Sequence, residues 1–156
     1  MQLVKEFGKQ LIVDNTHAFF SKPYESIDTI YSPRKFFGLP DGAYLYTDTF
    51  LSEELELDFS IPHMTHLMKR IEYGNASAAY QDYLDYCTSL VGQPIKRMSN
   101  LASALLSNID YENLKERQIK NFNYLHYVLG KDNKFEYDNF PSDTCPLSYM
   151  FYSEDR

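Results

Sequence analysis

The chain has no tryptophan, only two cysteines and no apolar run long enough to cross a membrane. Cys87 and Cys145 do not make a disulfide framework, which predicts a reducing, cytoplasmic location. Basic residues are also scarce, because 15 Lys and Arg stand against 22 Asp and Glu and the net charge is −7. Non-specific nucleic-acid binding and docking on anionic lipid both need a basic surface. We therefore expect neither nucleic acid nor membrane as a partner.

The remaining composition is that of one globular chain. Hydrophobic residues make up 44% of the 156 residues and charged residues 24%, close to the averages of folded proteins. Aromatic residues are frequent, with 14 Tyr and 11 Phe. A chain of this length can bury a hydrophobic core. Composition thus predicts a folded domain, without indicating what it does.

The pattern along the chain changes from strands to helices. Short apolar or aromatic runs predict three neighbouring strands, the first of them buried: Leu11–Val13, Asp28–Ser32 and Ala43–Asp48. Helical spacing predicts three helices, 1–10, Ala76–Leu90 and Asp110–Leu129, and Leu101–Leu106 is a short apolar run. Asp110 and Gly130 are typical caps for the last helix, and Leu147–Tyr152 is strand-like. The expected fold class is α/β, a partial sheet with packed helices.

Polar residues follow the predicted strands. Asp14 comes directly after the first strand and His17 three residues later, whereas Lys35 lies in the turn after the second strand. Ligands of α/β folds bind at the carboxyl ends of strands. We expect Lys35 to be partly desolvated between two phenylalanines and a tight turn, which would favour the uncharged, nucleophilic amine.

These residues lie in an order that resembles a known family. The patterns are Asp14-x-x-His17-Ala, then Ser32-x-x-Lys35, then Asp41-Gly-Ala-x-Leu-x-Thr, followed by Lys96-Arg-Met-Ser-Asn-Leu and by Arg117, Asn121 and Leu125. They resemble the DegT/DnrJ/EryC1/StrS family of sugar aminotransferases, which are fold-type I enzymes dependent on pyridoxal 5'-phosphate (PLP). The resemblance implies that residues 1–50 are the strand-rich, lysine-bearing segment of the large domain. It further implies that 51–130 are its helical continuation and that 131–156 begin a small C-terminal domain.

The resemblance also implies a role for each site residue. Asp14 would pair with the pyridine nitrogen, His17 would contact the phenolic oxygen or the ring edge, and Ser32 would contact the phosphate. Lys35 would be the catalytic residue that links to the cofactor and moves the substrate proton. The substrates would be a nucleotide-linked keto-sugar and glutamate, and the full-length enzyme would be a homodimer. The family's own Gly-Gly pair after the lysine is here Asp41-Gly42-Ala43.

The matched residues cover only part of such an enzyme. The glycine-rich phosphate cradle and the aromatic residue that stacks on the ring have no counterpart in this sequence. We therefore expect an incomplete enzyme that is inactive in transamination by itself.

Other patterns have simpler interpretations. The pair His63-x-x-His66 invites a zinc interpretation, but no third ligand lies at a telling spacing, so no metal is expected. Four tyrosines at helical spacing indicate a packing or contact face: Tyr73, Tyr80, Tyr83 and Tyr86. Two alternatives to the enzyme remain open, a non-catalytic α/β remnant and a helical interaction module built on 76–90 and 110–129.

Overall fold

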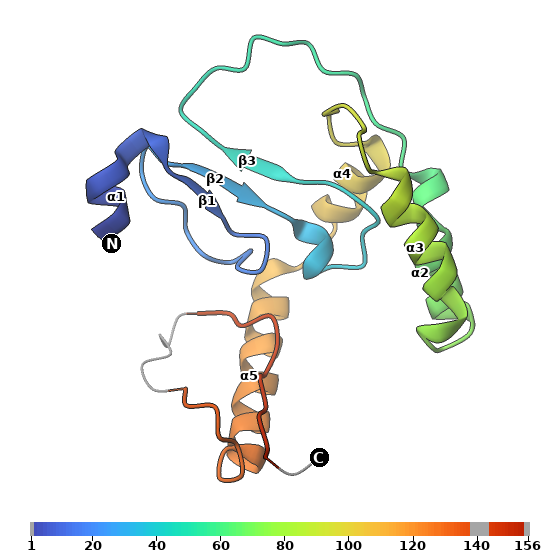
Figure 1. Cartoon of the computed structure of the whole chain (residues 1–156). Coiled ribbons are helices and arrows are strands. Elements are labelled where there is room, and N and C mark those ends of the chain that lie inside the picture. Colours follow the sequence, from blue (N-terminus) through green and yellow to red (C-terminus); the bar gives the residue numbers. More distant parts are fainter. Residues whose placement is uncertain (1, 138–143, 155–156) are drawn as a thin grey trace.

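Three short strands form one mixed sheet. The computed structural model describes residues 2–137 and 144–154. Its strands are β1 (Ile12–Asp14), β2 (Asp28–Tyr31) and β3 (Tyr44–Tyr46), in the order β1-β2-β3. β1 pairs with β2 in parallel, and β2 pairs with β3 in antiparallel register (Figure 1). The prediction of three neighbouring strands with Asp14 at the carboxyl end of the first is confirmed, as is the coarse α/β class.

The two faces of the sheet differ in burial. In β2 the side chains of Thr29 and Tyr31 are buried, whereas Ile30 between them is 40% exposed. Ile12 on β1 and Leu45 on β3 are exposed as well. The prediction that the first strand is buried is wrong, because β1 is an edge strand with a single neighbour and Ile12 is 62% exposed.

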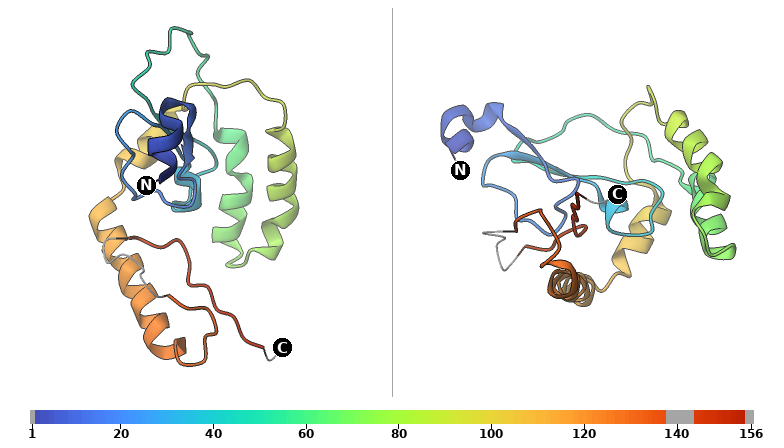
Figure 2. Two further views of the ribbon diagram at one scale, coloured as in Figure 1. Left: turned by 60° about the vertical axis from the view of Figure 1, so that its left-hand side comes forward. Right: turned by 60° about the horizontal axis from the view of Figure 1, so that its bottom comes forward.

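In the described part of the chain, four helices follow α1 (Gln2–Phe7). They are α2 (Thr65–Glu72), α3 (Tyr80–Ser89), α4 (Asn100–Ser107) and α5 (Tyr111–Leu129). Helices α2 and α3 lie side by side at one end of the sheet, and α5 extends away from it (Figures 1 and 2). The predicted helices are confirmed, and Asp110 caps α5 by accepting from the amide of Asn113 at 3.1 Å. Gly130 is its C-cap residue, as predicted.

Helix α2 was not predicted from the sequence. The structure has a 3-10 turn at Ile61–Met64 with Pro62 in its first positions, and α2 continues from it. Proline is well suited to the start of a helix, where its missing N–H leaves no bond unmade. The proline therefore marks a helix start.

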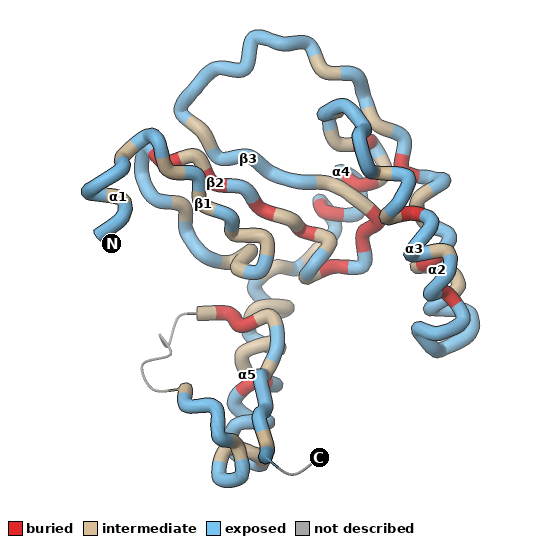
Figure 3. The backbone as a smooth tube through the Cα atoms, viewed as in Figure 1, coloured by how far each residue is buried: buried red, intermediate tan, exposed pale blue. Residues whose placement is uncertain are grey.

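The core lies where the sheet meets α4. Phe37, Leu39 and Leu106 are its buried members, and Figure 3 shows buried residues in the turn after β2 and in α4. Phe19 is a second centre, because its ring contacts that of Phe37 edge-to-face at 4.9 Å and stacks on that of Tyr111 at 6.0 Å. Edge-to-face and offset aromatic pairs add stability beyond their buried area. The many phenylalanines and tyrosines thus account for much of the core.

The last described segment lies along α5 without forming a strand. The Gln118 amide donates to the carbonyl of Leu147 at 3.3 Å, and the Asn133 amide donates to that of Met150 at 2.9 Å. The predicted strand at Leu147–Tyr152 is wrong, because the segment pairs with no strand in the described chain and its hydrogen bonds run mainly to side chains such as Asn133. Cys145 begins the segment and is buried, which raises the pKa of its thiol. The assignment of 131–156 to a small domain stays a prediction.

The open sheet generates a prediction about association. Ile12, Ile30 and Leu45 are exposed apolar side chains, and β1 and β3 each have only β2 as a strand neighbour within the described chain. Open edges and apolar patches pair with other chains. We expect the purified chain to self-associate as its concentration rises in light scattering. Leu45→Lys should reduce this association, whereas Tyr127→Lys on α5 should not. A monodisperse monomer at high concentration would contradict the expectation.

Candidate functional site

The sheet brings the four predicted site residues to one end. β1 and β2 are parallel, Asp14 is opposite Ile30, and the Asn15 amide donates to the carbonyl of Ile30 at 2.8 Å. Ser32 and the 3-10 turn Pro33–Lys35 follow the end of β2 directly. The loop after β1, which carries His17, begins at the same edge. Parallel pairing is therefore the feature that gathers these segments.

Asp14 is fixed by its own loop. Its carboxylate accepts a hydrogen bond from the Thr16 amide at 2.8 Å and another from the Thr16 hydroxyl. These bonds lower the pKa of Asp14, and the bond from the hydroxyl has the larger effect. The charge of His17 lowers this pKa slightly further. Asp14 is thus a carboxylate at neutral pH. His17 itself is exposed to solvent.

Lys35 is not desolvated as expected. It is exposed, because its 3-10 turn directs it away from the core that buries Pro33 and Phe37. It lines a hollow of about 280 Å³. Of the described residues that line this hollow, none is Asp14, His17 or Ser32. The structure therefore places the four residues at one end of the sheet without enclosing them in one pocket, and their cofactor roles stay predictions.

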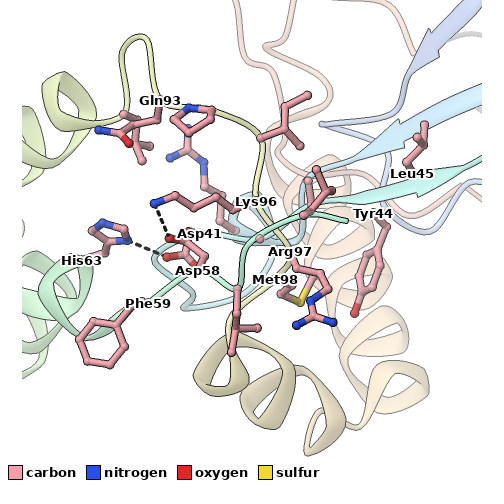
Figure 4. Close-up of a pocket in the computed structure, with 18 of the residues that line it drawn as sticks. Asp41, Tyr44, Leu45, Asp58, Phe59, His63, Gln93, Lys96, Arg97 and Met98 are labelled. Atoms are coloured by element: carbon pink, nitrogen blue, oxygen red, sulfur yellow. Dashed lines mark hydrogen bonds and ion pairs between the residues drawn. The ribbon is translucent and has the colours of Figure 1, made fainter. Parts of the chain in front are cut away.

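A larger cavity, of about 840 Å³, lies beside the sheet. Its apolar wall includes Ile30, Leu45 and Met98, and its polar wall includes Asp41, Asp58, His63 and Lys96 (Figure 4). The polar residues come from separate segments: the turn before β3, the long loop after it, the turn before α2 and the segment before α4. A backbone bridge pairs Leu57 with Arg97, and both residues line the cavity.

Asp41 is the centre of the polar wall. Its two carboxylate oxygens bond separately, one accepting from the Ser60 hydroxyl at 2.8 Å and the other lying 2.8 Å from Nδ1 of His63. Ser60 also shares a hydrogen bond with the Ser99 hydroxyl, which caps α4 by accepting from the amide of Ala102. Because Ser60 bonds the carboxylate rather than the imidazole, these residues do not form a nucleophilic Ser–His–Asp relay.

Tyr86 joins this wall to the turn that carries Lys35. Its hydroxyl donates to the carbonyl of Pro40 and accepts from Arg34 at 3.1 Å. Its ring stacks on His66, with centroids 5.0 Å apart, and lies 5.3 Å from the ring of His63. Burial raises the pKa of Tyr86, so its hydroxyl stays protonated and can donate. Tyr86, Arg34 and the histidines thus hold α2 and α3 against the turn.

The two histidines do not share a metal site. Nδ1 of His63 is hydrogen-bonded to the carboxylate of Asp41, whereas the ring of His66 stacks on that of Tyr86. Asp41, Asp58 and His63 each place one donor atom within 4.8 Å of the others. Both carboxylates already have partners, since Asp58 pairs with Lys96 at 3.3 Å and Asp41 contacts the His63 imidazole.

Sequence reasoning missed the network around Asp41. The chain separates Asp41 from His63 by 22 residues and Ser60 from Ser99 by 39, so no local spacing signals it. The Asp-Gly pair at 41–42 was the one available signal, and it was interpreted only as part of the family pattern. No family model, no curated protein and no solved structure matches this chain. Among the described residues, no helix is both long and apolar enough to cross a membrane.

The hydrogen bonds of Asp41 predict that removing its carboxylate lowers the free energy of unfolding substantially. In Asp41→Ala the Ser60 hydroxyl and the His63 imidazole lose a charged acceptor whose side chain is only 11% exposed. Such a loss costs about 2–3 kcal/mol, because the donors remain partly buried and unpaired. We expect urea denaturation to show this decrease in the free energy of unfolding. Asp132→Ala, at an exposed position, is the control and should change it by less than about 0.5 kcal/mol. Equal effects of the two variants would refute the role of Asp41.

His66 predicts a dependence of stability on pH. Burial lowers the pKa of His66 from 6.5, and the charges of Arg70 and Arg34 act in the same direction. The unfolded chain therefore binds this proton at a higher pH than the folded chain does. The contribution of His66 is complete above pH 6.5 and decreases as the pH falls from 6.5 toward the lowered pKa.

The comparison variant is His66→Phe, which keeps a ring against Tyr86 and removes the titrating group. As the pH falls from 7 to 5.5, the free energy of unfolding should decrease more for the wild type than for this variant. A difference that stays constant over this range would show that His66 is not the responsible group.

Proposed function

We propose that this chain is a PLP-dependent, aminotransferase-like protein of the sugar-aminotransferase type, which carries the lysine-bearing part of the site. The observation that supports it most is the parallel pairing of β1 with β2. This pairing brings the loop after Asp14 and the turn of Lys35 to the same sheet end. Ligands of α/β sheets bind at such ends. The family itself is inferred from the sequence patterns alone.

The residues at this end have the chemistry that the cofactor needs. Asp14 is ionised at neutral pH, because the bonds from Thr16 lower its pKa, and a carboxylate is what a protonated pyridine nitrogen requires. Among the described residues Lys35 forms no ion pair, and it is exposed. The Ser32 hydroxyl does not cap the turn that follows it, which leaves it free for a phosphate oxygen. The donor set therefore fits PLP.

When bound, PLP supplies an electron sink for a substrate carbanion. The residues of this chain would bind and orient it, with Asp14 holding a proton at the ring nitrogen and Ser32 contacting the phosphate. His17 would donate to the ring edge. Lys35 would form the covalent link and carry the substrate proton as a general base. A nucleotide-linked keto-sugar and glutamate are the proposed substrates, and the cytoplasm is the proposed location.

The same residues are too exposed for catalysis by this chain alone. Asp14, His17 and Lys35 are all in contact with solvent. An active site has to exclude water and to hold its groups to within about 0.5 Å. We propose that a second polypeptide surface, such as the partner in a homodimer, covers this end of the sheet in the active enzyme.

Covalent labelling tests the proposal. The chain is mixed with PLP, reduced with borohydride and mapped by mass spectrometry. We expect a visible absorption band that borohydride removes and a label concentrated on Lys35. Lys22→Ala, a change of an exposed loop lysine, should keep both signals, whereas Lys35→Ala should lose them. Asp14→Asn should weaken cofactor binding several-fold, because the neutral amide no longer balances a protonated ring.

Two outcomes would overturn the proposal. A label spread evenly over Lys22, Lys35 and other exposed lysines would show that no site exists, which favours the non-catalytic alternatives. With glutamate and a keto-sugar nucleotide added, we expect no 2-oxoglutarate above the Lys35→Ala background. Turnover by the chain alone would show that the exposed site is competent without a partner.

A further inference from the structure

The hollow that Lys35 lines lies beside the helices α2 and α3. Its volume is about 280 Å³, and it lies between residues 34–40 and the helices α2 and α3. The polar side chains that line it are Arg34, Lys35, His66, Arg70, Tyr83 and Tyr86. Residues from three segments thus converge on a space large enough for a small ligand or part of one.

The charge of this hollow is opposite to that of the chain. Three of its lining residues, Arg34, Lys35 and Arg70, are cationic, and no described Asp or Glu lines it, although the net charge of the chain is −7. The nearby carboxylate of Asp82 is occupied, because both of its oxygens accept from Lys69 at 2.8 Å. Like charges that converge without an acidic partner repel one another, and a bound anion relieves this repulsion.

The cations are available to a ligand. Arg70 and Lys35 are exposed and form no ion pair within the described part of the chain. Arg34 is oriented by its bond to the Tyr86 hydroxyl and by the Tyr86 ring, 5.9 Å from its guanidinium carbon. One of its nitrogens makes this bond, so other N–H groups remain unused.

His66 adds a polar group that lacks a partner. It is only 5% exposed, it lines the hollow, and its Nδ1 has no hydrogen-bond partner among the described residues. Most buried polar atoms in folded proteins have such a partner, so this one calls for an explanation. Nδ1 is shielded from solvent, so a ligand in the hollow would lie beside the imidazole ring rather than bond to this atom.

We propose that this hollow binds the phosphate group of a small phosphorylated ligand, with Arg70 and Arg34 as the guanidinium donors and Lys35 as the third cation. Guanidinium groups bind tetrahedral oxyanions through paired N–H donors, and three cations suit a phosphate dianion better than a single carboxylate. Ser32 does not line the hollow, so this site differs from the phosphate contact in the proposed cofactor arrangement. The inference rests on the charges of the hollow and does not require the proposed reaction.

Calorimetric titration of the full chain with inorganic phosphate, at an ionic strength kept constant with sodium chloride, tests this site. Arg70→Gln should bind phosphate about tenfold more weakly, because it loses one charge-assisted pair of hydrogen bonds. Arg70→Lys keeps the charge without the planar fork and should give an intermediate affinity. Lys131→Gln removes one exposed charge beyond the end of α5 and should bind as the wild type does. Circular dichroism melting shows that each variant is folded.

Two further ligands identify the source of the phosphate. Pyridoxine 5'-phosphate has no aldehyde and cannot react with Lys35, and a nucleoside diphosphate represents a sugar-nucleotide substrate. Each should compete with inorganic phosphate if its own phosphate occupies the hollow. Equal phosphate affinity in wild type and Arg70→Gln, or an equal loss in Lys131→Gln, would overturn the site. If Lys35 labelling fails while Arg70-dependent binding persists, only the proposed function fails.

Discussion

The carboxylate of Asp41 is the interaction on which the arrangement of this chain depends. It accepts a hydrogen bond from Ser60 and pairs with His63, and through Ser60 it reaches Ser99, the cap of α4. Three segments that are far apart in the sequence therefore meet at one charged group. A partly buried carboxylate is stable only while its partners remain in place. This requirement fixes α2 and α4 relative to the turn that carries Lys35.

Tyr86 extends this constraint to the cationic side of the turn. Its hydroxyl joins the carbonyl of Pro40 to Arg34, and its ring covers His66. Arg34 and Lys35 are adjacent in this turn, but their side chains have different environments. Arg34 is held by the tyrosine, whereas Lys35 stays exposed. The same turn thus supplies a structural cation, Arg34, and an exposed lysine, Lys35.

Lys35 lies between the two surfaces for which we propose functions. On one side is the sheet end with Asp14, where the proposed cofactor chemistry would take place, and on the other is the cationic hollow with Arg70. Both surfaces are open to solvent, which is consistent with a site that another surface completes.

The sequence by itself determined those helices and strands that have a clear local signal, such as a side-chain period or a capping residue. Helix α5 was predicted with its Asp110 cap, and the strands were found because side-chain periodicity and capping are local properties. The edge position of β1, the exposure of Lys35 and the pairing of Asp41 with His63 were decided only by the tertiary structure. These features depend on which segments become neighbours, and contacts between residues 22 or 39 positions apart leave no period in the chain. The polar network and the convergence of cations around the hollow therefore could not be seen before the fold was known.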